Sequence, residues 1–206
     1  MVTSPGPAEG KTSVTLGLAS ALSRLGLRVV AIEADLRRPA FARYALLPPS
    51  AGLTGVLRGD TVLASELIKL DTASWQPVSG EAGNGRPTIS VLPAGEVLPS
   101  APQRMLTGPR MESLLNVARS LADVVLVDTP PVGTVNDAAG LFPMADAVAV
   151  VARLGRTNKD AARRALRVIS NPQLEVAGVV ITDAGKSAQY GYYGTSPSVT
   201  AAMSRD

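Results

Sequence analysis

The stretch TSPGPAEGKTS, residues 3–13, decides which fold this sequence predicts. It is a loop rich in Pro and Gly that runs through Gly10 and Lys11 into the periodic pattern of a helix. Backbone N–H groups in such a loop, together with a helix N-terminus, form a cradle for phosphate oxygens. The strict pattern has Gly five residues before Gly10, but Pro5 stands there with Gly6 beside it. Nucleotide binding is the favoured interpretation, and an ordinary Gly-rich helix entry with a surface lysine is the alternative.

Apolar runs and helical patterns alternate along the rest of the chain. Short runs rich in β-branched residues predict buried strands at 28–33, 88–92, 124–128, 147–152 and 176–181. Helical spacing predicts helices at 12–25, 111–121 and 157–169. The Gly-, Pro- and Ser-rich segment 71–87 reads as an exposed loop. This order predicts a doubly wound, mainly parallel α/β sheet flanked by helices, with ligands bound at the carboxyl ends of the strands.

Each predicted helix carries a pattern that the structure can test. The first has an apolar face made of Val14, Leu18, Ala21, Leu22 and Leu25. The second is expected to turn inward Leu114, Leu115, Ala118 and Leu121. The third opens with Thr157 and has Asp160 three residues later, which is the pattern of a capping box.

Two of the predicted strands end in acids. VVAIEADLRRP carries Glu33 and Asp35, and VVLVDTPPV carries Asp128. A phosphate loop requires a strand-end acid that holds Mg²⁺ directly or through water. A lone acid of this kind reads as a turn or a helix cap, but two such strands beside a phosphate loop indicate a site. Arg37 and Arg38 stand next to these acids, either as a solvated pair or as contacts for phosphate or a partner.

Composition narrows the classes of function. Of the 206 residues 46% are hydrophobic and 3% aromatic, which suits a single domain whose parallel sheet is built from Ala, Val, Leu and Ile. The net charge of +3 has no basic stripe, so we expect no nucleic-acid partner. The sequence has neither Cys nor His, so any metal is a hard cation held by oxygen. No apolar run has the roughly 20 residues of a membrane span and no signal peptide is evident, so we expect the chain in the cytoplasm.

Seven motifs carry a resemblance that covers nearly the whole chain, from Thr3 to about Tyr193. They are SPGPAEGKT, EADLRRP, GLTGVLRG, LPAGEVLPSAPQRML, VDTPPV with the following Asn136-Asp137, GVV at 178–180, and QYGYYG. In this order and spacing they resemble the bacterial tyrosine kinases (BY-kinases) of capsule and exopolysaccharide synthesis. That family belongs to the P-loop proteins of the MinD/ParA-like superfamily.

The resemblance implies a role for each candidate site residue. The loop residues that bind the nucleotide are Gly6, Ala8, Glu9, Gly10, Lys11, Thr12 and Ser13. The ligands of Mg²⁺ and its waters are Thr12, Asp35 and Asp128. The catalytic residues are Lys11, Glu33, Asp35 and Asp128. In this assignment Glu33 accepts the proton of the attacking tyrosine or helps to order Mg²⁺, and Lys11 is expected to face solvent.

The resemblance also divides the chain into a nucleotide-binding kinase domain, residues 1–183, and a flexible tail, residues 184–206. Three of the four tyrosines lie in this tail, at Tyr190, Tyr192 and Tyr193. They are the implied phosphate acceptors, presented to a neighbouring subunit. The alternative is a Gly/Tyr loop that packs back on the domain.

The sequence departs from that family in several places. Glu33 stands where the family has Asp, Ala8 replaces a Gly, and Thr182 replaces an Asn that contacts adenine. The tyrosine cluster is short. Only Met1–Ser4 precede the phosphate loop, so we expect the first strand to be truncated to a stub or absent, with neighbouring strand edges unpaired. The family's oligomerising helix would lie further upstream, so we expect a truncated chain or one with a late start codon.

The resemblance implies an Mg²⁺-ATP-dependent tyrosine autokinase that phosphorylates tails in trans and regulates capsule or exopolysaccharide synthesis and export. It would act at the inner face of the plasma membrane through a polysaccharide co-polymerase that activates it. One alternative is a non-catalytic, nucleotide-binding scaffold for that co-polymerase. Another is a MinD/ParA-type ATPase, which ranks third because the loop lacks that group's first lysine and no amphipathic C-terminal helix follows.

Overall fold

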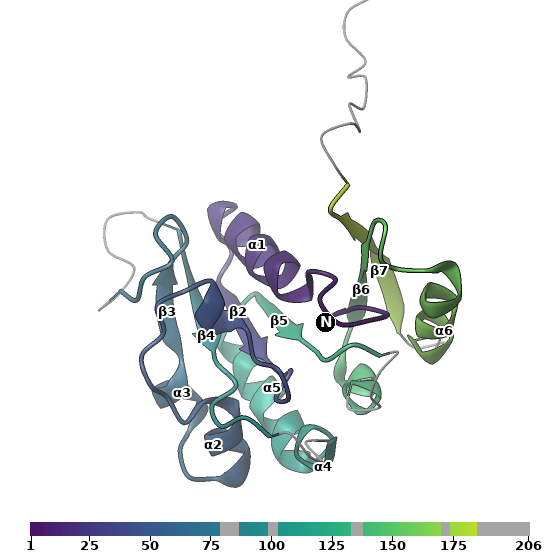
Figure 1. The fold of residues 1–206 in the computed structure, drawn as a ribbon. Helices are drawn as coiled ribbons and strands as arrows, with labels where there is room; N and C mark the ends of the chain where they lie inside the picture. Colours follow the sequence, from purple (N-terminus) through teal and green to yellow (C-terminus); the bar gives the residue numbers. More distant parts are fainter. Residues whose placement is uncertain (79–86, 99–102, 133–137, 170–173, 185–206) are drawn as a thin grey trace, which may run out of the picture.

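The computed structural model describes residues 1–78, 87–98, 103–132, 138–169 and 174–184. Within them, seven strands form one sheet in the order β3-β4-β2-β5-β1-β6-β7 (Figure 1). The strands are β1 (Val2–Thr3), β2 (Val29–Glu33), β3 (Ile68–Asp71), β4 (Thr88–Leu92), β5 (Val124–Asp128), β6 (Ala147–Arg153) and β7 (Glu175–Thr182). All neighbours are parallel except β3 and β4. The predicted doubly wound, mainly parallel sheet is confirmed.

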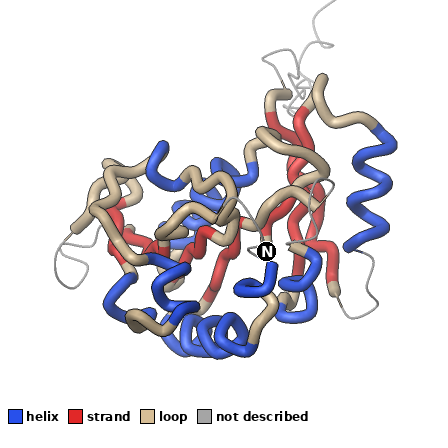
Figure 2. The backbone as a smooth tube through the Cα atoms, turned by 60° about the horizontal axis from the view of Figure 1, so that its bottom comes forward, coloured by secondary structure: helices blue, strands red, loops and turns tan. Residues whose placement is uncertain are grey.

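Helices cover both faces of this sheet (Figure 2). They are α1 (Lys11–Arg24), α2 (Gly52–Arg58), α3 (Leu63–Glu66), α4 (Gln103–Leu106), α5 (Pro109–Leu121) and α6 (Lys159–Ile169), with 3₁₀ turns η1 (Phe41–Arg43) and η3 (Ala139–Met144). Strand β2 shows why two layers are needed, because its side chains alternate between the faces. Val30 and Ile32 join the core under α5, while Val29 and Ala31 join the core under α1. No helix in the described ranges is long and apolar enough to cross a membrane.

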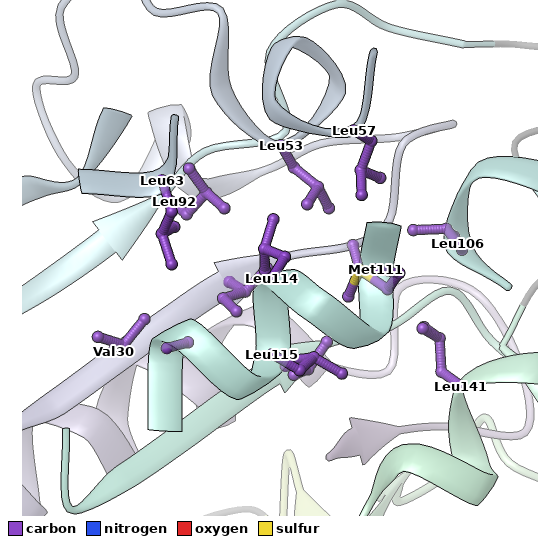
Figure 3. Close-up of a cluster of buried hydrophobic side chains, with 14 of the residues drawn as sticks. Val30, Leu53, Leu57, Leu63, Leu92, Leu106, Met111, Leu114, Leu115 and Leu141 are labelled. Carbon is purple, nitrogen blue, oxygen red and sulfur yellow. The ribbon is translucent and has the colours of Figure 1, made fainter. Parts of the chain in front are cut away.

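The larger core lies between the sheet and α5 (Figure 3). Met111, Leu114 and Leu115 project from α5 toward side chains of β2, β4 and α2. The prediction for this helix holds for Leu114, Leu115 and Ala118, which are buried. It is wrong for Leu121, which lies at the last residue of the helix and is 42% exposed.

Helix α1 forms where predicted, and Leu22 of its predicted inward face packs against the core, but the prediction is wrong for Leu18 and Leu25. Leu18 and Leu25 are exposed, at 38% and 77%. The buried side chains of this helix are Lys11, Thr15, Leu16, Ala19, Ser20 and Ser23. The hydroxyls of Thr15 and Ser23 donate to carbonyls of their own helix, at 3.0 and 2.9 Å, so these small residues can be buried without unpaired donors.

Strand β1 is a stub of two residues between β5 and β6, as expected. Val2 pairs with Asp128 on one side and with Ala149 on the other. In the described register this is the one pairing that β1 makes with β5. The stub nevertheless leads directly into the phosphate loop, so it fixes where that loop begins.

Several elements differ from the sequence predictions. Strand β3 and helices α2, α3 and α4 were not predicted, and β3 ends at Asp71, where the predicted loop begins. Helix α6 begins at Lys159, and the side chain of Asn158 accepts the N–H of Ala161 at 2.7 Å. Asn158 is therefore the N-cap, and the capping box predicted for Thr157 is wrong.

Candidate nucleotide-binding site

The phosphate loop lies between β1 and α1, at the carboxyl edge of the sheet. Two of its residues have left-handed backbone conformations, Ala8 at φ 59° and Gly10 at φ 97°. Gly10 is the N-cap of α1 and supplies no side-chain hydrogen bond to the helix. The first N–H groups of α1 therefore remain available to phosphate oxygens.

Gly10 is required by its surroundings as well as by its conformation. A Cβ at this position would lie 3.1 Å from the methyl carbon of Thr182, at the end of β7. The hydroxyl of Thr182 donates to the carbonyl of Glu9 at 2.7 Å. Thr182, which replaces the adenine-contacting Asn of the resemblance, therefore holds the phosphate loop itself.

A cavity of about 740 Å³ opens over the loop. Its walls are loop residues 7–13, the segment after β2, Pro130 and Pro131 after β5, and the ends of β6 and β7. Of the predicted site residues, Lys11, Thr12 and Asp35 line it, at the edge where a doubly wound sheet binds its ligand, while Asp128 and Glu33 are not among its described lining residues. A second cavity of about 800 Å³ lies at the opposite edge, and no acid is among its described lining residues. The electrostatics of phosphate and Mg²⁺ binding therefore favour the first cavity.

Lys11 lines this cavity, but the prediction that it faces solvent is wrong. The residue is only 7% exposed. Its positive charge acts on Asp35 and Asp128, where it opposes the rise in pKa that burial causes. A buried lysine that lines the cavity is positioned to bind phosphate oxygens with little reorganisation.

Asp128 lies directly beneath the loop and points toward it. The hydroxyl of Thr12 donates to its Oδ2 at 2.6 Å. Its other oxygen, Oδ1, is buried and has no hydrogen-bond partner among the described residues. Burial raises the pKa of Asp128 to about 7, while the Thr12 hydrogen bond and the charge of Lys11 oppose this shift.

An unpaired buried carboxylate oxygen beside a hydroxyl fits a hard divalent cation. No group of three or more acids that could hold a metal occurs within the described ranges. An ion at Thr12 and Asp128 would therefore take its remaining oxygens from phosphate and water, as Mg²⁺ commonly does.

Asp35 is the acid that faces the cavity. It is half-buried, and its Oδ1 accepts the N–H of Arg38 at 3.2 Å. Burial raises the pKa of Asp35, and the nearby charge of Lys11 opposes the shift. Arg37 and Arg38 line the same cavity, where they could contact phosphate or a partner, and that contact stays a prediction.

Glu33 has a different position from the one expected of a proton acceptor. Its Oε1 accepts the N–H groups of Ala40 and Phe41, the latter at 2.7 Å, and its Oε2 accepts that of Ala94 at 3.0 Å. It is 2% exposed and is not among the described residues that line the cavity. Burial raises its pKa, and these three hydrogen bonds oppose the shift. Glu33 is one methylene longer than the Asp of the family, and its carboxylate is occupied by three backbone N–H groups. This geometry does not support a role for Glu33 as the base that accepts the tyrosine proton.

Two contacts at the rim of the cavity were not predicted. The hydroxyls of Ser13 and Tyr44 are 2.6 Å apart. The guanidinium of Arg153 pairs with Asp183 at 3.0 Å and also donates to the carbonyl of Ala8 at 3.3 Å. Tyr44 and Asp183 stand in segments without periodicity, so the sequence carried no signal for either.

The remaining candidates divide between the loop and the tail. The side chain of Glu9 turns inward and is 3% exposed, so only its backbone is available to a nucleotide. The N–H of Gly6 donates to this carboxylate at 2.8 Å. Tyr190, Tyr192 and Tyr193 lie outside the described residues.

Comparison with known proteins defines the class first. The CobQ/CobB/MinD/ParA nucleotide binding domain matches residues 1–192. MinD of Pyrococcus horikoshii, solved with Mg-ADP, matches this structure with a TM-score of 0.67 at 19% sequence identity. The matched region is 91% of this chain and 70% of the MinD chain. At that identity the likeness shows the fold alone.

Closer relatives narrow the class. The tyrosine-protein kinase YwqD of Bacillus subtilis is 32% identical over 197 residues, which are 95% of this chain and 77% of YwqD. The kinase domain of the Escherichia coli tyrosine kinase ETK has a TM-score of 0.73 at 28% identity, covering 93% of this chain and 71% of its own. The succinoglycan biosynthesis transport protein ExoP of Rhizobium meliloti is 30% identical over 89% of this chain, which spans only 22% of ExoP. This chain belongs to the CobQ/CobB/MinD/ParA nucleotide-binding family and, within it, to the bacterial tyrosine-protein kinases.

Proposed function

We propose that this chain is an Mg²⁺-ATP-dependent protein-tyrosine kinase of polysaccharide synthesis and export. The observation that carries the proposal is the 2.6 Å hydrogen bond from the Thr12 hydroxyl to Oδ2 of Asp128 beneath the phosphate loop, with Oδ1 of Asp128 buried and without a partner among the described residues. The pair supplies a hydroxyl and a carboxylate at the place where a P-loop protein holds Mg²⁺.

The residues that line the cavity, together with Asp128 beneath the loop, divide the work of phosphoryl transfer. Loop N–H groups and Lys11 would bind the β and γ phosphates, and Thr12 and Asp128 would hold Mg²⁺, which would supply positive charge to neutralise the phosphates. The tyrosine oxygen bonds to the γ phosphorus as the bond to the bridging oxygen breaks and ADP leaves. We assign the phenolic proton to Asp35, because its carboxylate lines the cavity while that of Glu33 is held by backbone N–H groups.

The proposed substrates are Tyr190, Tyr192 and Tyr193 of another copy of the chain. Gly191 and Gly194 flank them, and an acceptor hydroxyl must come within roughly 3 Å of its base. Each added phosphate brings roughly −2 charge, which weakens contacts between copies by repulsion. The proposed partner is a membrane polysaccharide co-polymerase, which would keep the chain at the inner face of the membrane. The name of ExoP, a transport protein for succinoglycan biosynthesis, supports this assignment.

A nucleotide-binding scaffold without catalysis is the second candidate. The observation that favours it is the engagement of Glu33 with three backbone N–H groups, because the family's Asp at this position would then have no working counterpart.

Mass spectrometry of the tail separates the two candidates. Trypsin releases residues 187–205, which contain all three tail tyrosines. After incubation with Mg²⁺-ATP at high protein concentration, we expect phosphate on this peptide from the wild type. We expect none from Lys11→Met, which keeps most of the apolar stem and removes the charge, and titration calorimetry should find Mg²⁺-ATP binding lost in this variant. Nucleotide binding by the wild type without tail phosphate, also with its co-polymerase present, would favour the scaffold.

A further inference from the structure

Glu9 is a buried acid in the middle of the phosphate loop. Its side chain is 3% exposed, and both carboxylate oxygens have partners. Oε2 accepts the N–H of Gly6 at 2.8 Å, within the loop itself. Oε1 accepts the hydroxyl of Thr157 at 2.5 Å, across 148 residues of sequence. This carboxylate therefore ties the loop to a distant segment instead of facing the ligand.

Thr157 lies in the turn between β6 and α6. Its oxygen accepts the N–H of Arg153 at 2.8 Å, so its proton is directed to the Glu9 carboxylate. Helix α6 is capped by Asn158, which leaves the Thr157 hydroxyl free for this contact. The result is a continuous chain of hydrogen bonds from the phosphate loop to the end of β6.

Two further contacts fasten the same part of the loop. The carbonyl of Ala8 accepts from the Arg153 guanidinium at 3.3 Å, and the carbonyl of Glu9 accepts from Thr182 at 2.7 Å. Ala8 has φ 59°, a left-handed conformation that is unfavourable for an L residue. A loop strained in this way keeps its shape only where its surroundings hold it.

We propose that Glu9 and Thr157 form a positioning pair that keeps the phosphate loop in its nucleotide-binding conformation. The inference rests on the proposed nucleotide binding and adds two positioning residues to it. Neither side chain needs to touch the nucleotide. Without the pair the loop populates other conformations, and the apparent affinity falls by the fraction that remains competent. Hydrogen bonds to a charged group are strong enough for a loss of about tenfold.

The test compares Thr157→Val with Thr157→Ser, which keeps the hydroxyl, by calorimetric titration of Mg²⁺-ATP. We expect the Val variant to bind about tenfold more weakly and the Ser variant to bind like the wild type. Glu9→Gln, alone and combined with Thr157→Val, supplies a double-mutant cycle, and we expect the combined loss to be smaller than the sum. Thr61→Val is the matched control, because it breaks another Thr–Glu hydrogen bond, to Glu66 at 2.9 Å, among residues that do not line the cavity.

A purely structural role would lower the melting temperature without nucleotide and leave the affinity of the folded protein unchanged. Wild-type affinity in both Thr157→Val and Glu9→Gln would overturn the positioning pair while leaving nucleotide binding intact. Should Thr157→Val not fold, Glu9→Gln and Thr157→Ser decide in its place. Absence of Mg²⁺-ATP binding in the wild type would overturn the proposed function itself, and the two failures are therefore distinguishable.

Discussion

Asp128 shows at the scale of a residue how the site is prepared for a cation. It is an acid at 1% exposure whose Oδ1 has no partner among the described residues. Its folded pKa of about 7 lies above its ordinary value of 3.8, so between these values the folded chain holds a proton that the unfolded chain has released. Asp35 and Glu33 shift in the same direction. The stability that Asp128 contributes is therefore greatest below about pH 4 and declines as the pH rises to about 7.

Urea unfolding without nucleotide tests this linkage. As the pH rises from 5 to 8, the buried Asp128 loses its proton, and the free energy of unfolding of the wild type should fall by on the order of 2–3 kcal/mol. Asp128→Asn keeps an oxygen for Thr12 and abolishes the titration, so its stability should fall less over the same interval. In the wild type, Mg²⁺-ATP affinity should weaken below pH 7, where the proton competes with the cation. Parallel pH profiles for the two proteins would show that Asp128 does not titrate in this range.

At the scale of elements, Glu33 braces β2 against its neighbours. One carboxylate oxygen holds the start of η1 and the other holds Ala94, which follows β4. Glu33→Ala leaves three backbone N–H groups without this acceptor, and we expect a loss of about 2–4 kcal/mol in the free energy of unfolding. Glu33→Gln keeps one acceptor oxygen and should lose less.

The readouts for these variants are urea unfolding and Mg²⁺-ATP affinity, measured together. If Glu33 has a structural role, the free energy of unfolding should change greatly, while the Mg²⁺-ATP affinity of the folded protein should change little. Unchanged stability with lost phosphoryl transfer would instead return Glu33 to the role of base.

The predicted elements show which signals a sequence carries. Strands with continuous β-branched runs, such as β5 and β6, were predicted closely, because burial on both faces leaves an unmistakable apolar pattern. The buried face of α1 was not predicted correctly, because it includes Thr15 and Ser23, whose hydroxyls donate hydrogen bonds to carbonyls of the same helix. The short α2, α3 and α4 were missed because four to seven residues are too few to display a period.

Over the whole molecule, the sequence predicted the meeting of the phosphate loop with Asp128, because parallel strands bring their carboxyl ends to one edge. It could not predict the burial of Lys11 or the contact between Glu9 and Thr157. The first depends on how the Lys11 side chain is oriented in the folded site, and the second joins residues 148 positions apart in the sequence, so no local pattern indicates either. The tail tyrosines stay a prediction.

The most direct test of the proposed kinase activity measures tail phosphorylation in a mixture of two variants, each of which lacks one part of the reaction. Asp128→Asn keeps the tail tyrosines but loses the site, while the triple variant Tyr190→Phe, Tyr192→Phe and Tyr193→Phe keeps the site but loses the acceptors. Their tail peptides differ in mass, so mass spectrometry after incubation with Mg²⁺-ATP assigns any phosphate to one chain. We predict phosphate on the tail of Asp128→Asn in the mixture and none when that variant is incubated alone. An unphosphorylated tail in the mixture, also with the co-polymerase present and with Mg²⁺-ATP bound to the triple variant, would contradict transfer between copies.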